Sequence, residues 1–164
     1  MKRLHIFGLL LLITSALPLS AQDRTPYTTI MARAIKRVEP GWRYTYGWCT
    51  CPRTVPGQVW RDIGTWERTG KDGKRESVDV WVVLAGSTAE SAEWMERWAN
   101  VISHAPDQTE SYPLGDEAYL SKGPTTFRRI LNCRKGRYLI TVRGDSQELV
   151  ERFAKYALMR LKTG

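Results

Sequence analysis

VWRDIGTWERTGKDGKRESVDVWVVL, residues 59–84, is the stretch that decides the fold. Two runs rich in β-branched and aromatic residues, 59–69 and 75–84, flank the tetrapeptide Lys71-Asp72-Gly73-Lys74. Asp-Gly is a strong hairpin signal because both central residues of such a turn take positive φ. The stretch therefore predicts a β-hairpin, and with it a sheet as the framework of the protein.

The turn also predicts a register. If Asp72-Gly73 is the two-residue loop, Lys71 pairs with Lys74. One face of the hairpin then carries the valines of the second strand and is expected to be the core. The opposite face carries Trp66 and Trp81, which lie diagonally, with Arg68 and Asp79 beside them. The pairs expected on the valine face are Ile63–Val82, Thr65–Val80 and Glu67–Val78.

Upstream of the hairpin, the pattern changes from helical to alternating. Ile30, Ala34 and Val38 recur at helical spacing between Pro26 and the stop signal Pro40-Gly41, which predicts a first helix. Residues 42–48 alternate instead, with aromatic side chains on one face, and this alternation predicts a strand. Residues 49–57 are a Pro-rich loop.

Downstream, a helix, a strand, a second hairpin and a last helix are expected. Residues 87–105 begin with a capping box and end before Pro106. A short strand follows the turn at Gly115. Strands 125–133 and 137–143 flank a turn at Lys135-Gly136, and the last helix is capped by Asp145 or Ser146. The facing pairs expected in this second hairpin are Leu131–Ile140, Cys133–Tyr138 and Arg128–Arg143.

This order of elements favours one fold class. Twice, a run of strands is followed by one amphipathic helix, and a first helix precedes both runs. Such an order predicts an α+β domain of two layers, an antiparallel sheet with helices packed on one face.

The N-terminus has the three-part form of a secretory signal peptide. Lys2 and Arg3 precede a short apolar core, and a polar exit leads to Ala21. We expect residues 1–21 to be removed and residues 22–164 to form a single domain, periplasmic or extracellular, with no transmembrane segment after cleavage. The apolar core is too short to span a bilayer comfortably, which disfavours the alternative of an uncleaved membrane anchor.

The charge of the chain is basic. The formal net charge is +8, and cleavage would leave 23 basic against 17 acidic residues, or +6. This balance favours polyanions, anionic headgroups or acidic surfaces as partners. Nucleic acid is a poor expectation for an exported chain.

The last third of the chain carries a resemblance. Gly115-Asp116-Glu117-Ala118-Tyr119, then a hairpin around residues 134–138, then an Ala-rich helix is similar to a pattern in exported bacterial domains of unassigned function. The resemblance implies an exported location and an α+β fold, and it implies no activity.

Three cysteines offer alternatives. Because thiols pair in oxidising compartments, we expect Cys49 or Cys51 to form a disulfide with Cys133. The first alternative is a metal site built from the three cysteines and His104. The second is thiol-redox chemistry at Cys49 and Cys51, although the usual redox motif has two intervening residues rather than one.

No set of residues predicts catalysis, and no cofactor is expected. His104 ends a helix, where the helix dipole alone favours it. A Gly-x-Ser-x-Gly elbow is missing from the sequence. The paired acids are expected to be solvated, because acidic residues are rarely buried; they are Asp116, Glu117, Glu90, Glu93 and Glu96.

Two surfaces are left as candidate binding sites. The face with Trp66, Arg68, Asp79 and Trp81 suits stacking if it is exposed; alternatively, the first helix or the 42–48 strand covers it. Residues 122–143 hold seven basic side chains and no acid.

In this basic segment, facing Arg128 and Arg143 would need an acid such as Asp79, or a bound anion, to offset their repulsion. The alternative is a solvated basic face with its arginine stems packed on the sheet. We therefore predict a non-catalytic binding or envelope-associated domain whose partner is an envelope protein, a glycan or an anionic surface. The alternative function is a thiol-redox or metal-binding protein.

Overall fold

The structure is a computed structural model that describes residues 26–50, 60–102, 109–121 and 128–161. The predicted signal peptide, residues 1–21, lies outside this described part, as do Cys51 and His104. The described residues form three helices, α1 (Tyr27–Val38), α2 (Thr88–Ile102) and α3 (Gln147–Arg160), and seven strands, β1 (Arg43–Thr50), β2 (Trp60–Thr69), β3 (Arg75–Leu84), β4 (Thr109–Ser111), β5 (Glu117–Ser121), β6 (Arg129–Lys135) and β7 (Tyr138–Gly144).

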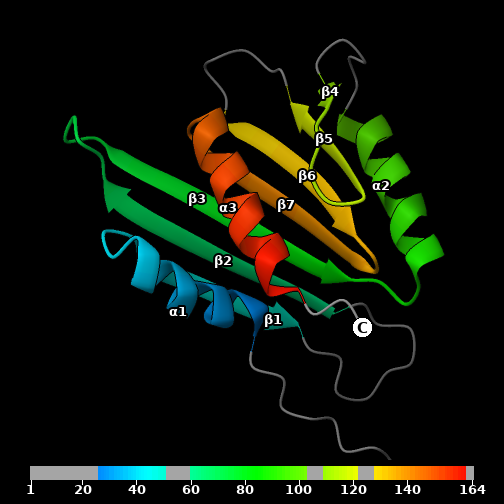
Figure 1. Cartoon of the computed structure of the whole chain (residues 1–164), viewed down its shortest axis with the longest axis horizontal. Helices are drawn as coiled ribbons and strands as arrows, with labels where there is room; N and C mark the ends of the chain where they lie inside the picture. The colour runs from blue at the N-terminus through cyan, green and yellow to red at the C-terminus, as the bar shows by residue number, and fades with distance from the viewer. Residues whose placement is uncertain (1–25, 51–59, 103–108, 122–127, 162–164) are drawn as a thin grey trace, which may run out of the picture.

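All seven strands belong to one antiparallel sheet. Its order is β1-β2-β3-β7-β6-β5-β4, so the two long hairpins β2–β3 and β6–β7 meet at the centre (Figure 1). The predicted α+β class and the antiparallel sheet are confirmed. None of the described helices is both long enough and apolar enough to cross a bilayer.

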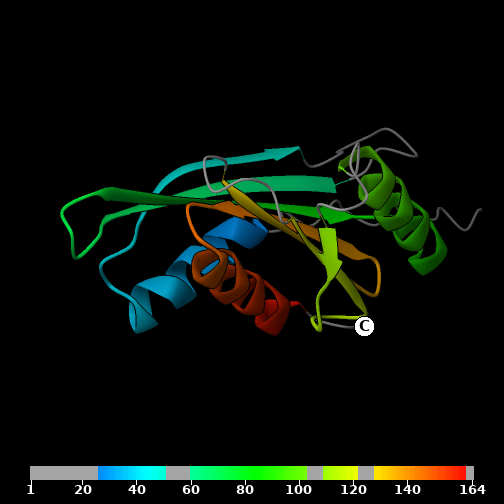
Figure 2. The same ribbon diagram turned by 90° about the horizontal axis from the view of Figure 1, so that it is seen from above.

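Helices α1 and α3 cover one face of the sheet (Figure 2). Phe153 of α3 is central to the core between them, with ring centroids 5.0 Å from Trp42 and 5.6 Å from Trp66. Edge-to-face contacts of this kind are stabilising beyond the area they bury. The other large side chains that are fully buried in this core include Met31, Ile35, Leu120, Leu131, Ile140, Val78, Val80 and Val82.

Helix α2 departs from the single covered face predicted from the sequence. Val82 and Val83 are consecutive in β3 and therefore point to opposite faces. Val82 belongs to the core under α1 and α3, whereas Val83 packs with Met95 of α2 and Leu139 of β7. Helix α2 thus lies against the opposite face, over β7 and β6, at one end of the sheet.

The β2–β3 register differs by one residue from the prediction. Gly70 N–H donates to Lys74 O at 2.7 Å, and Gly73 takes a φ of 78°, so the loop has three residues, Lys71–Gly73, rather than two. Ile63 consequently pairs with Trp81, and Trp66 pairs with Val78. A one-residue slip moves each side chain of a strand to the other face. Trp66 therefore lies on the valine face, and Trp81 does not.

The β6–β7 register differs by two residues, which preserves the faces. Lys135 pairs with Tyr138 around a Gly136-Arg137 loop, and Gly136 takes a φ of 55°. Cys133 therefore pairs with Ile140 rather than with Tyr138, and Leu131 pairs with Val142. The predicted buried face of this hairpin is nevertheless confirmed, because Leu131, Cys133 and Ile140 are all fully buried.

The start of α1 is capped from the sheet. Pro26 at the N-cap provides no side-chain hydrogen bond. Instead, the Asp62 carboxylate of β2 accepts from the Thr28 amide at 2.7 Å and from the Thr28 hydroxyl at 2.8 Å. A carboxylate at this position satisfies amides that have no partner within the helix and also meets the positive end of the helix dipole. Asp62 thereby fixes α1 on β2.

Candidate ligand-binding site

The open face is the face of the sheet opposite α1 and α3. Three exposed aromatic side chains project from it: Tyr46 and Trp48 of β1 and Trp81 of β3. Trp48 and Trp81 are 45% and 41% exposed, whereas Trp42 and Trp66 on the covered face are 4% and 1% exposed. These tryptophans are thus exposed on the open face of the sheet and buried on its covered face.

A pocket of about 260 Å³ lies on the open face where it meets α2. We call it the tryptophan pocket, because four tryptophans from β1, β3 and α2 line it. Its lining residues are Trp48, Arg61, Asp62, Ile63, Trp81, Val82, Val83, Trp94 and Trp98.

The sheet register explains two walls and the floor of this pocket. Trp48 pairs with Ile63, and Ile63 pairs with Trp81, so the three side chains form one cross-strand row. Strands lie about 4.8 Å apart, which separates the Trp48 and Trp81 backbones by about 10 Å across the row. Ile63 is smaller than its two neighbours. The row is therefore an apolar floor with an indole on either side.

Helix α2 supplies the remaining aromatic wall. Trp94 and Trp98 are four residues apart, and this spacing places them on one face of the helix. Both are partly buried against the small cluster formed by Val83, Met95 and Leu139. This packing holds the two indoles at the end of the open face.

The polar groups of the tryptophan pocket are few. Within the described residues, the exposed Arg61 guanidinium pairs with no carboxylate. The Asp62 side chain is fully buried and bound to Thr28 on the other face. Burial raises the pKa of Asp62, although hydrogen bonds from Thr28 act in the opposite direction. Arg61 is therefore the one charged side chain that the pocket offers to a ligand.

Arg128 does not face Arg143 as predicted, because Ile130 pairs with Arg143, but Arg128 does have an acidic partner. Arg128 Nη1 donates to Asp79 Oδ2 at 2.7 Å, and Nη2 donates to the Ser77 carbonyl at 2.7 Å. Its Nε lies 3.3 Å from Asp145 Oδ1. Asp79 is the neighbouring acid named from the sequence, and it also pairs along the backbone with Arg143. Arg128 thus joins β6, β3 and the start of α3, and these carboxylates occupy its guanidinium.

Four of the six predicted binding residues come together on the open face. Asp79, Trp81, Arg128 and Arg143 are neighbours there, and the Arg143 guanidinium carbon lies 5.8 Å from the centre of the Trp81 ring. Trp66 and Arg68 do not join them. The prediction that Trp66 and Trp81 share a face is wrong, because the one-residue register shift buries Trp66 between Tyr44 and Phe153.

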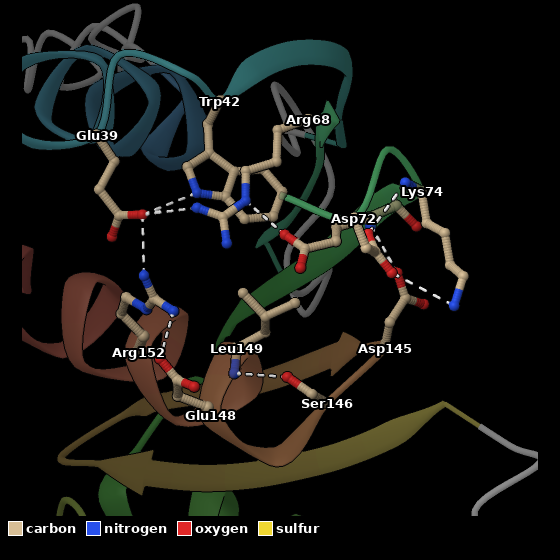
Figure 3. A network of polar contacts seen from close by, with 12 residues as sticks. Glu39, Trp42, Arg68, Asp72, Lys74, Asp145, Ser146, Glu148, Leu149 and Arg152 are labelled. Carbon is tan, nitrogen blue, oxygen red and sulfur yellow. Dashed lines mark hydrogen bonds and ion pairs between the residues drawn. The ribbon is translucent and has the colours of Figure 1, made fainter. Parts of the chain in front are cut away.

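Arg68 instead belongs to a network around Glu39 (Figure 3). Its guanidinium lies 4.4 Å from the Trp42 ring centre, and it pairs with Glu76 and Glu39. Glu39 also accepts from Trp42 Nε1 at 2.9 Å and binds Arg152 and Tyr156 of α3. One carboxylate therefore links the end of α1, the residue before β1, strand β2 and helix α3.

The Glu39 network affects the acidity of its central group. Partial burial acts to raise the pKa of Glu39, but hydrogen bonds from Tyr156 and Trp42 and the charge of Arg152 outweigh it and hold the pKa below its usual value. The charged form is thus the one that the fold prefers. This network is a structural junction, since the Glu39 carboxylate binds side chains from β2, from α3 and from the residue before β1.

The predicted disulfide is wrong for the described pair. Cys49 lies in β1 and Cys133 lies in β6, four strand positions away, or about 19 Å at normal strand spacing. A disulfide needs Cα atoms within about 7 Å. Cys133 is a free thiol, fully buried under α3, and burial raises its pKa to about 12. Cys51, the other predicted partner, lies outside the described residues.

The alternative metal site is not seen in the described part of the chain. No three side chains of His, Cys, Asp or Glu gather there in a group that could hold an ion. His104, the fourth predicted ligand, lies outside those residues, as does Cys51. The paired acids expected to be solvated are largely so: Asp116, Glu93 and Glu96 are exposed, while Glu90 and Glu117 are half-buried.

Sequence reasoning missed Trp48, Trp94 and Arg61 as members of one site. The i, i+4 spacing of Trp94 and Trp98 was visible in the sequence and marks a helix face with two indoles. The row from Trp48 to Trp81 required two correct registers, which the pattern alone does not supply. Comparisons of the chain with known protein families, with curated proteins and with solved structures found no match.

Proposed function

We propose that this protein is an exported, non-catalytic ligand-binding domain whose binding site is the tryptophan pocket. The observation that carries the proposal is the cross-strand row Trp48–Ile63–Trp81, open to solvent and closed at one end by the indoles of α2. Ligand sites are commonly concave, mostly apolar and fitted with a small number of polar groups. The pocket has this composition, with Arg61 as its charged group.

Exposure of indole rings to water is unfavourable, and this supports the proposal that the open face binds a ligand. Contiguous apolar patches on the surface of a monomer mark interaction sites. Here the sheet already buries Trp42 and Trp66 on its other face, so the fold has a place for tryptophan in its core. Trp48 and Trp81 nonetheless project into solvent at the rim of a pocket. Tryptophan at such a place provides a large rigid surface for stacking.

Export is the second part of the proposal. It rests on the three-part pattern of residues 1–21, with a basic start, a short apolar core and a polar exit. The test is N-terminal sequencing of the protein recovered from the cell envelope or medium. We expect the mature chain to begin at Gln22, and an unprocessed chain in the cytosol would contradict export.

The thiol-redox alternative receives no support from Cys133. Reactive thiols have a lowered pKa and access to solvent. Cys133 has neither, since it is fully buried and its pKa is raised to about 12. Cys133 is therefore a core residue rather than a candidate redox thiol.

The binding proposal is tested by screening small molecules against the mature chain with intrinsic tryptophan fluorescence. The panel holds sugars, amino acids, quaternary ammonium compounds and organic acids. We expect at least one class to bind, and Trp81→Ala to weaken that binding by about 10-fold or more.

The matched control is Tyr46→Ala, which removes an exposed aromatic side chain on the same face but outside the pocket lining. This variant should bind as the wild type does. Binding that survives Trp81→Ala unchanged would place the site elsewhere, and a panel with no binder at all would contradict the proposal.

A further inference from the structure

We infer that the tryptophan pocket takes a small zwitterion that carries a fully methylated ammonium group and an anionic group. This inference rests on the proposed function and deepens it by naming the class of ligand. It follows from the size of the pocket, the chemistry of its walls and the charge at its rim.

Size limits the ligand first. The volume of about 260 Å³ lies below the range of roughly 300–1,000 Å³ that holds drug-sized ligands. A compact head with a short arm suits this space, whereas a polymer segment would extend far beyond the four indoles. The pocket is therefore matched to a small molecule.

The walls favour a cation that needs no hydrogen bonds. Tryptophan is the best side chain for cation–π attraction, and clusters of aromatic rings are the recognised way to bind quaternary ammonium groups. Among the described residues, Trp48, Trp81, Trp94 and Trp98 make no ring–ring contact with one another. The four indoles are thus not stacked on one another, although Arg143 lies over the Trp81 ring and Trp94 and Trp98 pack partly on the Val83–Met95–Leu139 cluster.

The molecule already shows this chemistry twice. Arg68 lies 4.4 Å from the centre of the Trp42 ring, and Arg143 lies 5.8 Å from the centre of the Trp81 ring. Both contacts place a cation beside an indole. The second involves a wall of the tryptophan pocket, so a pocket-lining ring is one that attracts positive charge in this protein.

Charge explains why the ligand must also carry an anion. The pocket is lined by Arg61, and Arg143 lies nearby, while the Asp62 carboxylate is held by Thr28 on the other face. A bare cation would meet two positive charges and no free negative one. An anionic group on the ligand that reaches the unpaired Arg61 guanidinium reverses that balance, because guanidinium binds carboxylate and phosphate well.

The polar inventory disfavours a sugar. Buried hydroxyl groups need hydrogen-bond acceptors as well as donors. The lining offers indole N–H groups, one guanidinium and aliphatic side chains, and its one carboxylate is already bound. A trimethylammonium group needs no hydrogen-bond donor or acceptor. The inference therefore commits to the methylated ammonium rather than to a ring of hydroxyls.

The test compares three probes that differ by one feature each. Glycine betaine carries both groups, 3,3-dimethylbutanoate replaces its cationic nitrogen with carbon at nearly the same shape, and choline lacks the carboxylate. Binding is measured by calorimetry on the mature chain. We expect glycine betaine to bind about 10-fold more tightly than either comparison probe.

Variants then assign each half of the ligand to its side chains. Trp81→Ala should weaken glycine betaine by about 10-fold, while the control Tyr46→Ala leaves it unchanged. Arg61→Gln should remove the advantage of glycine betaine over choline, because it removes the partner of the carboxylate. Circular dichroism of each variant confirms that the fold is retained.

Three results would overturn the inference. Equal binding of 3,3-dimethylbutanoate and glycine betaine would show that the pocket selects apolar shape alone. Equal binding of choline and glycine betaine by the wild type would remove the role given to Arg61. Failure of glycine betaine alongside Trp81-dependent binding of a sugar or another compound would reject the ligand class and leave the proposed function standing, whereas the absence of any ligand in the broader panel rejects both.

Discussion

Tryptophan has different roles on the covered and open faces of the sheet. On the covered face, Trp42 and Trp66 pack around Phe153, and the neighbouring charges close on Glu39. On the open face, Trp48 and Trp81 flank a pocket, and among the described helices only α2 lies against this face, at one end. The difference teaches that the count of tryptophans predicts neither stability nor binding. The face on which each one lies decides its role.

The largest expected effect is the difference in lost unfolding free energy between tryptophan variants on the two faces. Trp66→Ala should lower the free energy of unfolding by about 3–5 kcal/mol, because it leaves a cavity in a closed core. Trp81→Ala should lower it by less than about 1 kcal/mol, since that ring is 41% exposed. Urea denaturation of both variants measures the contrast. Losses of similar size would contradict the assignment of the two residues to opposite faces.

The Glu39 junction is expected to give the next largest effect. Glu39→Gln should cost about 1.5–3 kcal/mol at neutral pH, because it removes charge-assisted hydrogen bonds from Arg152 and weakens the contacts of Trp42 and Tyr156. Glu93→Gln is the matched control on α2. Its exposed ion pair with Arg97 should be worth under about 0.5 kcal/mol. A cost for Glu39→Gln no larger than that of the control would refute the junction.

The Glu39→Gln variant also tests how the free energy of unfolding depends on pH in the acidic range. The pKa of Glu39 lies below its ordinary value of 4.5 in the folded protein, so its stabilising contribution is complete above pH 4.5 and is lost as the pH falls through the folded pKa. The stability gap between wild type and Glu39→Gln should therefore shrink on acidification. Asp62 titrates with the opposite sign because burial raises its pKa, and comparison with the variant cancels it. A gap that is constant with pH would exclude this linkage.

Gly64 offers a smaller effect at the contact between α1 and β2. A Cβ there would lie 2.8 Å from both the Thr28 Cβ and the Trp66 ring, so Gly64→Ala should cost about 1–3 kcal/mol by overpacking. The control is Gly41→Ala, where a Cβ meets no atom within 4 Å and the stability should change by under about 1 kcal/mol. If both changes were neutral, α1 would not sit on β2 as described.

The smallest expected effect is the lack of reaction of a buried thiol with an alkylating reagent. Cys133 should resist alkylation in the folded protein and react on unfolding, because it is fully buried with a pKa near 12. Mass spectrometry of the peptide that contains Cys133, with and without denaturant, reports this directly. Rapid labelling of the native protein at Cys133 would contradict the burial of this thiol in the core.

The sequence predicted elements better than it predicted faces. Each described helix and each strand of the two hairpins lies close to its expected place, because periodicity, caps and turn residues are local signals. The β2–β3 turn admits either a two- or a three-residue loop around Asp72-Gly73, and that difference of one residue exchanges the faces of Trp66 and Trp81. The β6–β7 slip of two residues left Cys133 and Leu131 buried as expected.

The candidate site was only partly within reach of the sequence. The sequence offered Asp79 or a bound anion as a partner for Arg128, from a register that is two residues off, and the structure shows the Arg128–Asp79 contact at 2.7 Å. The tryptophan pocket depends on three strands in register and on α2 choosing the face opposite α1 and α3. Both features are determined by packing between segments that are distant in the sequence, so local sequence patterns do not predict them.

Quenching of tryptophan fluorescence by iodide tests the central division of the molecule most directly. The double variant Trp48→Phe/Trp81→Phe should lose emission that iodide reaches, whereas Trp66→Phe should lose emission that iodide does not reach. Retention of the iodide-accessible emission in the double variant, or its loss in Trp66→Phe, would contradict the placement of the pocket on the open face.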